Sequence, residues 1–255
     1  MPGLKLQGKN VWLTGASSGI GEALAYELAR RGARVAITAR RAEVLEKIVS
    51  EIRAQGGQAW SFRGDVTNLE EMKRVVADIE QTVGPIDLAI PNAGTHLFTV
   101  PEQFNSAEYL SIMQLNFGGI LFCIEAVLPR MLERGKGYLA PVASLAGYRG
   151  LPRAAAYGAS KSAAIHFLES IRFHLVRRNI TVSIVNPGFV KTPLTDKNDF
   201  QMPFLVDADR AAKIICRGIE RGKREIAFPW PFTWVLKIAR ILPDRIYEVL
   251  VNRCW

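Results

Sequence analysis

Short apolar runs alternate with longer amphipathic stretches along most of the chain. Continuous apolar runs of this kind predict strands that are buried on both faces, and the amphipathic stretches between them predict helices that cover a sheet. We expect strands at Asn10–Thr14, Arg34–Thr38, Gln58–Arg63, Ile86–Ile90, Tyr138–Ala143 and Thr181–Val185. We expect helices at Gly19–Arg31, Ala42–Gln55, Asn68–Val83, Ser106–Leu132 and Ala154–Arg177.

The order of these elements predicts a single α/β domain. Because parallel strands need a crossover connection, the alternation of strands and helices favours a doubly wound parallel sheet with helices on both faces. The chain has 255 residues, which suits one domain of this kind with a well-buried core. We expect this domain over residues 1–227, followed by an amphipathic helical extension over residues 228–255.

A glycine-rich turn links the first predicted strand to the first predicted helix. It reads Thr14-Gly15-Ala16-Ser17-Ser18-Gly19-Ile20-Gly21. Glycines allow a tight turn and a close approach of the backbone to a phosphate, whose charge is stabilised at a helix N-terminus. We therefore expect the pyrophosphate of a dinucleotide at this turn, with contacts from Gly15, Ser17, Ser18, Gly19, Ile20 and Gly21.

The end of the second predicted strand indicates which dinucleotide binds. A carboxylate there would bind the adenosine ribose hydroxyls, whereas a basic residue accommodates the 2′-phosphate of NADP. The chain has Arg40 and Arg41 at this point and no carboxylate before Glu43. Since guanidinium groups donate paired hydrogen bonds to phosphate, we expect NADP(H). The alternative is that both arginines are simply solvated on a loop.

Tyr157 and Lys161 lie four residues apart on a predicted helix, so that they share one face. Free tyrosine has a pKa near ~10, and a lysine ammonium beside it favours the phenolate and lowers that value. Ser144 follows a predicted strand at its carboxyl end, where open α/β sheets bind ligands. These three side chains indicate acid–base chemistry beside the nucleotide.

In these motifs, and from about residue 6 to about residue 225, the chain resembles the short-chain dehydrogenase/reductase family, which has a Rossmann-type fold. The resemblance implies hydride transfer between nicotinamide and an alcohol or carbonyl substrate. It implies that Tyr157 is the general acid and base, that Lys161 binds the nicotinamide ribose and tunes Tyr157, and that Ser144 binds the substrate oxygen. Asn116 would hold a water of the proton relay.

The resemblance also assigns further contacts to the cofactor. Asp65 and Val66 would contact adenine, and Thr192 would bind the carboxamide. The remaining implied contacts are Asn92, Ala93, Gly94, Tyr157, Lys161, Pro187, Gly188 and Val190.

Two residues depart from the family's usual pattern, Pro91 before Asn92 and Pro141 inside a predicted strand. Proline removes a donor from the ladder of a sheet, so we expect the pairing of these two neighbouring strands to be altered locally.

The residues expected around the substrate are largely apolar. By analogy with the family they are His96, Leu145, Ala146, Tyr148, Leu151, Phe189, Met202 and Phe204. Because the set holds no Arg or Lys for a carboxylate or phosphate, it indicates a hydrophobic ketone or secondary alcohol. His96 is expected either as a substrate ligand or, more commonly, as a surface or loop histidine. Pro193–Val206 is the expected lid.

The C-terminal extension contains two amphipathic stretches, Phe232–Leu242 and Asp244–Asn252. In the first stretch Thr233, Lys237 and Arg240 fall within a narrow arc, and the other positions are apolar. Wide apolar faces with tryptophan and flanking cations are typical of helices that lie at a membrane surface. The alternatives are that this face packs on the domain, covers the substrate, or forms an oligomer interface.

Charge and cysteine content add little to this reading. The net charge is +9, but residues 210–255 alone carry ten Lys and Arg against four Asp and Glu, and no nucleic-acid motif accompanies them. No uncharged run of 18 or more apolar residues predicts a membrane span. Cys123, Cys216 and Cys254 lack metal-ligand spacing, so we expect no metal site and free thiols in a reducing cytoplasm.

The leading hypothesis is therefore a cytoplasmic NADP(H)-dependent carbonyl reductase or alcohol dehydrogenase. The resemblance implies a homodimer or homotetramer that forms through Ser106–Leu132 and Ala154–Arg177. One alternative is a membrane-surface enzyme with a lipid-like substrate. Another is a non-catalytic NADP-binding regulator, against which Tyr157 and Ser144 argue because binding alone would not need them. Nucleic-acid binding has only the charge in its favour.

Overall fold

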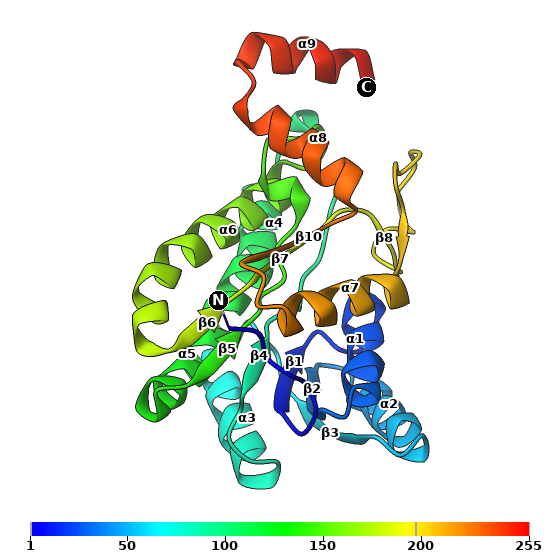
Figure 1. Ribbon diagram of the computed structural model, residues 1–255. Helices are drawn as coiled ribbons and strands as arrows, with labels where there is room; N and C mark the ends of the chain where they lie inside the picture. Colours follow the sequence, from blue (N-terminus) through cyan, green and yellow to red (C-terminus); the bar gives the residue numbers. More distant parts are fainter. Residues whose placement is uncertain (1, 197, 255) are drawn as a thin grey trace.

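A six-stranded parallel sheet lies at the centre of the computed structural model, which describes residues 2–196 and 198–254 (Figure 1). Its strands are β1 (Asn10–Thr14), β2 (Arg34–Ala39), β3 (Gln58–Arg63), β4 (Leu88–Ile90), β5 (Gly137–Leu139) and β6 (Ile180–Val182). Their spatial order is β3-β2-β1-β4-β5-β6, and every neighbouring pair is parallel. The predicted doubly wound sheet is confirmed, and its order of strands reverses between β1 and β4.

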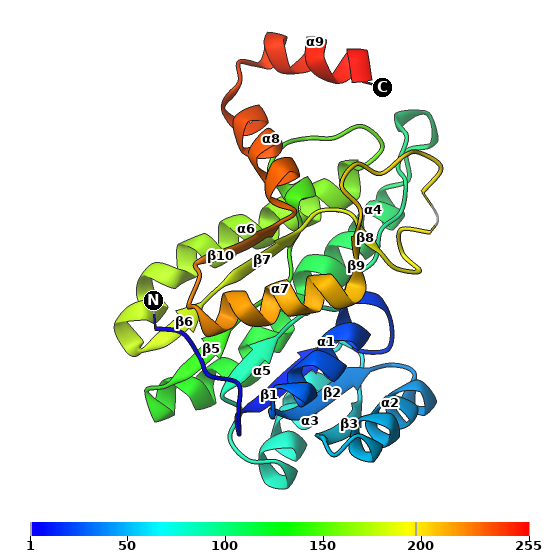
Figure 2. The same cartoon turned by 45° about the vertical axis from the view of Figure 1, so that its right-hand side comes forward.

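Helices cover both faces of the sheet, and each face has its own apolar core (Figures 1 and 2). The first core contains α1 (Gly19–Arg30), α2 (Ala42–Ala54) and α7 (Ala208–Glu220); the second contains α3 (Leu69–Thr82), α5 (Gly119–Arg134) and α6 (Ala155–Leu175). Successive strand residues point to opposite faces. Accordingly, Val11 and Leu13 of β1 lie in the first core and Trp12 lies in the second.

Local capping sets the ends of two helices at the residues where the sequence favours it. The side chain of Asn68 accepts a hydrogen bond from the Glu71 amide at 3.1 Å and so caps the first turn of α3. Gly135 adopts a left-handed conformation with φ 61° directly after α5. The start of α3 and the end of α5 therefore lie close to their predicted positions.

The predicted strand Thr181–Val185 is two strands in the structure. β6 pairs with β5, whereas β7 (Ile184–Pro187) pairs with β10 (Glu225–Phe228). Ser183 lies between them, and its amide donates to the Leu139 carbonyl at 2.9 Å. The sheet therefore continues beyond its six regular strands toward β10.

Pro91 and Pro141 both follow the last regular residue of a strand, since β4 ends at Ile90 and β5 at Leu139. Their carbonyls still accept hydrogen bonds, that of Pro91 from the Val142 amide at 2.8 Å and that of Pro141 from the Val185 amide at 3.0 Å. The expected local alteration is a shortening of both strands to three residues, while main-chain hydrogen bonds continue past them.

The predicted helix Ser106–Leu132 is divided in the structure. A π-helical turn, Gln114–Gly118, joins α4 (Ser106–Met113) to α5. Together they form a 29-residue helical segment that is long and apolar enough to cross a membrane by length and composition alone. Because 44% of its most apolar window is buried inside the protein and α5 packs on α3, we interpret it as a core helix.

The chain ends in α8 (Trp230–Ile241) and α9 (Asp244–Cys254), which confirms two helices in the predicted extension. Both lie beyond the sheet at the top of Figures 1 and 2. β10 ends at Phe228, one residue past the predicted domain boundary. The predicted lid connects β8 (Val190–Lys191) to β9 (Val206–Asp207); positions 1, 197 and 255 of the predicted regions lie outside the described residues.

Candidate active site

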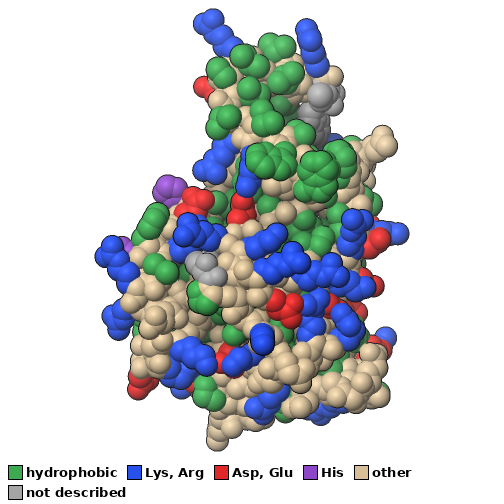
Figure 3. All heavy atoms as spheres, viewed as in Figure 1, with side chains coloured by type: hydrophobic (Ala, Val, Ile, Leu, Met, Phe, Trp, Pro, Cys, Tyr) green, Lys and Arg blue, Asp and Glu red, His purple; other side chains and the backbone are tan. Residues whose placement is uncertain are grey.

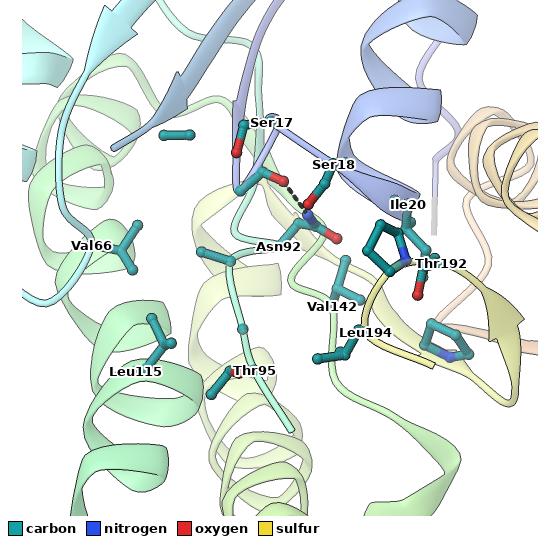
Figure 4. A pocket seen from close by; sticks show the side chains of 18 of the residues that line it. Ser17, Ser18, Ile20, Val66, Asn92, Thr95, Leu115, Val142, Thr192 and Leu194 are labelled. Carbon is teal, nitrogen blue, oxygen red and sulfur yellow. Dashed lines mark hydrogen bonds between the residues drawn. The ribbon is translucent and has the colours of Figure 1, made fainter. Parts of the chain in front are cut away.

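A pocket lies where the strand order reverses, at the carboxyl ends of β1, β2 and β4. All the residues predicted to contact the cofactor line it (Figure 4 shows part of the set). They are Gly15, Ser17, Ser18, Gly19, Ile20, Gly21, Arg40, Arg41, Asp65, Val66, Asn92, Ala93, Gly94, Tyr157, Lys161, Pro187, Gly188, Val190 and Thr192. The structure therefore brings together residues that lie up to 177 positions apart in the chain.

The glycine-rich turn leaves no room for side chains at two of its positions. Gly15 has φ +66°, and a Cβ on Gly21 would lie 2.1 Å from the carbonyl oxygen of Gly15. The side-chain Nδ2 of Asn92 donates to the carbonyls of Thr14 at 3.1 Å and of Gly15 at 3.2 Å. Figure 4 shows Asn92 directed toward this turn. The residue that follows β4 thus holds the backbone of this turn in place at the start of α1, where a helix N-terminus favours a phosphate.

Two arginines line the adenosine end of the pocket. Arg41 donates from Nη2 to the carbonyl and to the hydroxyl of Ser17, both at 2.9 Å. Arg40 is 75% exposed in its side chain, and its Nη1 lies 3.9 Å from Asp65 Oδ2. Arg41 is therefore partly positioned by the glycine-rich turn, whereas Arg40 is free to reorient toward an anion.

Tyr157 and Ser144 meet at the other end of the pocket. Burial raises the pKa of Tyr157, and a hydrogen bond with Ser144 acts in the opposite direction. Ser144 Oγ also accepts from the Ala146 amide at 3.1 Å and donates to the Pro187 carbonyl at 3.3 Å. These bonds fix the serine hydroxyl beside the phenol, so that both can reach one substrate oxygen.

Lys161 lies behind Tyr157 and is almost completely buried, with 3% of its surface exposed. Its Nζ donates to the Val142 carbonyl at 3.0 Å and lies 5.8 Å from the centroid of the Tyr157 ring. Burial lowers the pKa of Lys161 to about 8. The Tyr–Lys proximity predicted from the four-residue spacing is confirmed, but the expected lowering of the tyrosine pKa is wrong for the protein without cofactor, because burial raises the pKa of Tyr157.

Asn116 belongs to the π-helical turn between α4 and α5, a type of turn that is frequent at functional sites. Its side chain exchanges two hydrogen bonds with the main chain of Thr95, at 2.8 Å and 2.9 Å, and donates to Ser160 Oγ at 3.0 Å. Ser160 Oγ in turn donates to the Tyr157 carbonyl at 2.7 Å. Asn116 therefore ties the segment after β4 to the helix that carries the tyrosine.

The predicted substrate residues fall into two groups. His96 is half-buried on the irregular segment after β4, with its ring centroid 4.9 Å from that of Tyr157, so it is a loop histidine whose role as a substrate ligand stays a prediction. Phe189 is half-buried and stacks on Phe232 of α8 at 5.5 Å. Three further predicted residues lie on connections between regular elements. Leu151 and Met202 are half-buried there, and Phe204 is exposed.

Other predicted substrate residues have structural partners. The Tyr148 hydroxyl donates to Glu225 and accepts from Asn186, and the ring is buried in the second core. Leu145 is 1% exposed, while Ala146 donates its amide to Ser144. The Tyr148 hydroxyl is therefore bound away from the nucleotide pocket, and a contact of Tyr148 with the substrate stays a prediction.

Several pocket residues were missed by the sequence analysis. They are Ala39, Gly64, Thr95, Leu115, Val142 and Ala143, whereas Pro193, Leu194 and Thr195 of the lining belong to the predicted lid. Almost all are chain neighbours of predicted residues, which is the signal that would have found them. Among the described residues, no three His, Cys, Asp or Glu side chains are grouped as metal ligands would be.

A dinucleotide cradle that ends at a buried Tyr–Ser–Lys group defines a protein of the oxidoreductase class. The chain belongs to the short-chain dehydrogenase/reductase family, because the model of the short chain dehydrogenases matches residues 9–202. An uncharacterised oxidoreductase of Myxococcus xanthus is 37% identical over 241 residues, which cover 94% of this chain and 95% of that protein.

Named relatives and solved structures support the same assignment. The 11-beta-hydroxysteroid dehydrogenase-like protein 2 of Arabidopsis thaliana is 34% identical over 250 residues, covering 95% of this chain and 80% of that protein. Ketoacyl reductase HetN of Nostoc is 36% identical over 256 residues, covering 95% and 89%. The crystal structure of an actinorhodin polyketide ketoreductase with NADPH has a TM-score of 0.79 and 28% identity, covering 86% of this chain and 95% of that chain.

Proposed function

We propose that this chain is an NADP(H)-dependent oxidoreductase that interconverts a hydrophobic ketone and its secondary alcohol. The observation that carries the proposal is the meeting of Tyr157, Ser144 and Lys161 at one end of a pocket whose other end is lined by Arg40 and Arg41. A nicotinamide bound there supplies or accepts the hydride. The chain's own residues bind and orient the substrate, and they exchange the proton.

In the direction of reduction, the Tyr157 hydroxyl donates its proton to the carbonyl oxygen as that oxygen gains negative charge. Ser144 Oγ donates a hydrogen bond to the same oxygen. Lys161 keeps a positive charge near the phenol, which favours the phenolate left behind. In the direction of oxidation the same phenolate accepts the proton of the alcohol. Asn116 positions the helix that carries Tyr157 through Ser160.

The preference for NADP(H) is supported by two guanidinium groups at the end of β2, where the chain has no carboxylate before Glu43 and the carboxylate of Asp65 lies beside Arg40. The exposed side chain of Arg40 can close on a 2′-phosphate, and Arg41 is already bound to Ser17 of the turn. Paired hydrogen bonds to phosphate are the geometry that favours arginine over lysine.

The preference for a hydrophobic substrate is supported by a series of aromatic rings that leads to Tyr157. Phe189 contacts Phe200 with ring centroids 5.7 Å apart, and Phe200 contacts Phe98 at 6.3 Å. Phe98 contacts His96 at 4.8 Å, and His96 contacts Tyr157. An apolar wall of this kind favours a substrate whose body is hydrocarbon and whose reactive group is a single oxygen.

Titration calorimetry with NADPH and NADH tests the cofactor assignment. We expect NADPH to bind at least about tenfold more tightly, which corresponds to about 1.4 kcal/mol. The double variant Arg40→Ala/Arg41→Ala is expected to lose this difference and to keep its affinity for NADH. Arg74→Ala, an exposed arginine on α3, is the matched control. Equal affinity of the native protein for both cofactors would contradict the preference.

A screen of hydrophobic ketones for NADPH oxidation tests the reaction. Tyr157→Phe is expected to reduce turnover by about 10²–10⁴-fold, because it removes the proton donor and leaves the cradle intact. Its affinity for NADPH is expected to stay near that of the native protein. Tight NADPH binding without turnover of any carbonyl would favour the non-catalytic regulator instead.

A further inference from the structure

The helix α8 presents its apolar stripe to solvent instead of to the protein. Trp230, Trp234, Ile238 and Ile241 recur at spacings of four, four and three residues, and they are exposed by 74%, 60%, 53% and 80%. Isolated exposed apolar residues need no explanation, but a contiguous stripe on one helix face marks an interaction surface. The alternative that this face packs on the domain is therefore excluded for these four residues.

Thr233 and Lys237 of the polar arc of α8 face the domain, whereas Arg240 at the end of the arc is exposed. Thr233 is buried and donates to the Pro229 carbonyl at 2.9 Å. Lys237 binds the half-buried carboxylate of Glu225 on β10. Leu236 is buried in the second core beside these polar contacts. Rotating the helix to bury its tryptophans would break the ion pair, so the exposure of the stripe is built into the fold.

The helix α9 continues the exposed apolar surface. Ile246, Val249 and Leu250 recur at helical spacing and are exposed by 51%, 52% and 48%. Figure 3 shows hydrophobic side chains gathered over α8 and α9, with Lys and Arg side chains projecting at the edges. The opposite side of α9 is held to the domain, since the Tyr247 hydroxyl donates to the Gly150 carbonyl and Arg149 lies 4.7 Å from the Tyr247 ring. We call Trp230, Trp234, Ile238, Ile241, Ile246, Val249 and Leu250 together the apolar tail face.

Cations accompany this face. Arg240, Arg245 and Arg253 are exposed, and no ion pair involves their side chains within the described part of the chain. Tryptophans among aliphatic residues with arginines at the margin match the polarity of a bilayer interface, where rings lie at the headgroup level and cations meet anionic lipids. A second copy of the chain would instead present the same unpaired cations to this margin.

We propose that the apolar tail face docks this protein peripherally on an anionic lipid bilayer. The face adjoins the aromatic series of the pocket, because Phe232 of α8 stacks on Phe189 and Phe204 lies 6.4 Å from Phe232. Docking would therefore direct the aromatic series that leads to Tyr157 toward the hydrocarbon of the bilayer, from which an apolar substrate can enter. This last consequence rests on the proposed function, whereas the docking itself does not.

Sedimentation of the full chain with vesicles tests the docking. Vesicles of phosphatidylcholine with phosphatidylglycerol are expected to pellet the protein, and vesicles of phosphatidylcholine alone are expected to bind it more weakly. The variant Arg245→Gln/Arg253→Gln should bind anionic vesicles about fivefold more weakly for each arginine removed. Arg63→Gln/Arg74→Gln, which changes two exposed arginines on β3 and α3, should bind as the native protein does.

A matched pair of double variants tests the apolar contribution. Trp234→Gln/Ile238→Gln changes two residues of the face that are exposed by 60% and 53%, and it should abolish pelleting. Phe104→Gln/Val176→Gln changes residues elsewhere that are exposed by 67% and 49%, and it should pellet normally. NADPH affinity, measured for every variant, verifies folding.

Three results would overturn the proposal. They are the absence of pelleting, equal pelleting of both double variants, and a native oligomer that only Trp234→Gln/Ile238→Gln dissociates, which would make the face a contact between copies. The variant Tyr157→Phe separates this proposal from the proposed function, since it should pellet fully whether or not the chain reduces ketones.

Discussion

His96 is a polar side chain beside Tyr157 that makes ring contacts but no hydrogen bond to another described residue. Its ring contacts Phe98 and Tyr157 edge to face. Burial, and next the charge of Arg153, lowers the pKa of His96. The imidazole is therefore neutral at pH 7 and offers one donor and one acceptor to a substrate group near the reactive oxygen.

We predict that His96→Phe lowers kcat/KM for the best ketone by about three- to tenfold, the effect of losing one neutral hydrogen bond. His96→Gln, which keeps a donor and an acceptor, should recover most of the loss. Both variants should bind NADPH normally, because His96 does not line the nucleotide pocket. An unchanged kcat/KM in His96→Phe would show that the ring serves only packing.

Lys161 makes stability depend on pH in a defined direction. Its pKa is about 8 in the folded protein, below the ordinary value of 10.5, so the unfolded chain binds more protons between these values. Stability therefore rises with pH through this range. We predict that the free energy of unfolding of the native protein, relative to Lys161→Met, increases by about 3 kcal/mol between pH 8 and 10.5 in the absence of cofactor.

Urea unfolding at several pH values measures this difference. Lys213→Met on the exposed side of α7 provides the control for the loss of a lysine at the surface. A flat difference for Lys161→Met would mean that the ammonium is better solvated than its burial suggests.

At the scale of elements, Glu225 joins β10 to α8. Its carboxylate accepts from the Asn186 amide at 2.9 Å, from the Tyr148 hydroxyl and from Lys237. Burial acts to raise the pKa of Glu225, but these hydrogen bonds, with that of Lys237 first, hold it below its usual value. The carboxylate therefore contributes stability that is present above the unfolded pKa and is lost as the pH falls through the folded pKa.

We predict that Glu225→Gln lowers the free energy of unfolding by about 1–3 kcal/mol at pH 7, because three donors lose a charged acceptor. The difference from the native protein should shrink as the pH falls below 4.5, the ordinary carboxyl value. Thermal and urea unfolding measure it, with Glu248→Gln on the exposed side of α9 as the control. A loss no larger than that of the control would contradict an anchoring role.

The sequence predicted most elements because their signals are local. Gly19 and Gly21 and the apolar run of β1 specify strand, turn and helix without reference to the rest of the chain. The π-helical turn around Asn116 was not predictable, since nothing in the hydrophobic period distinguishes it from a continuous helix. The orientation of α8 was not predictable either, because the period shows two arcs but only the partner Glu225 decides which arc is buried.

The residues of the candidate site also separate into those that the sequence could predict and those that it could not. Most residues predicted to bind the cofactor follow strands whose ends the sequence locates, and all of the predicted set line one pocket. The substrate residues lie on irregular connections, where neighbours in space are not neighbours in sequence. The bond of Tyr148 to Glu225 and the contact of His96 with Tyr157 therefore emerged only from the fold.

At the scale of the whole molecule, an apolar hollow on α4 and α5 supports the predicted homo-oligomer. Its lining includes Leu110, Phe117, Leu121 and Phe122, and Leu110 is 67% exposed. We predict that Leu110→Glu dissociates the oligomer, because a carboxylate would be buried without a partner at the contact. Size-exclusion chromatography with light scattering measures the mass. Leu205→Glu, at a residue exposed by 44% outside these helices, should leave it unchanged.

If Leu110→Glu and the native protein have the same mass, the contact between copies lies elsewhere. A mass that falls in both variants would indicate general destabilisation, which the NADPH affinity of each variant would reveal.

The uneven burial of the tryptophans has a practical consequence for spectroscopy. Trp12 is fully buried and donates to Thr38 Oγ1 at 3.0 Å, whereas Trp230 and Trp234 face water. Unfolding moves the ring of Trp12 into water, whereas covering α8 removes the rings of Trp230 and Trp234 from water. The emission maximum of this protein should therefore shift to the red when the domain unfolds and to the blue when its tail is covered, so one unlabelled sample distinguishes the two events by colour.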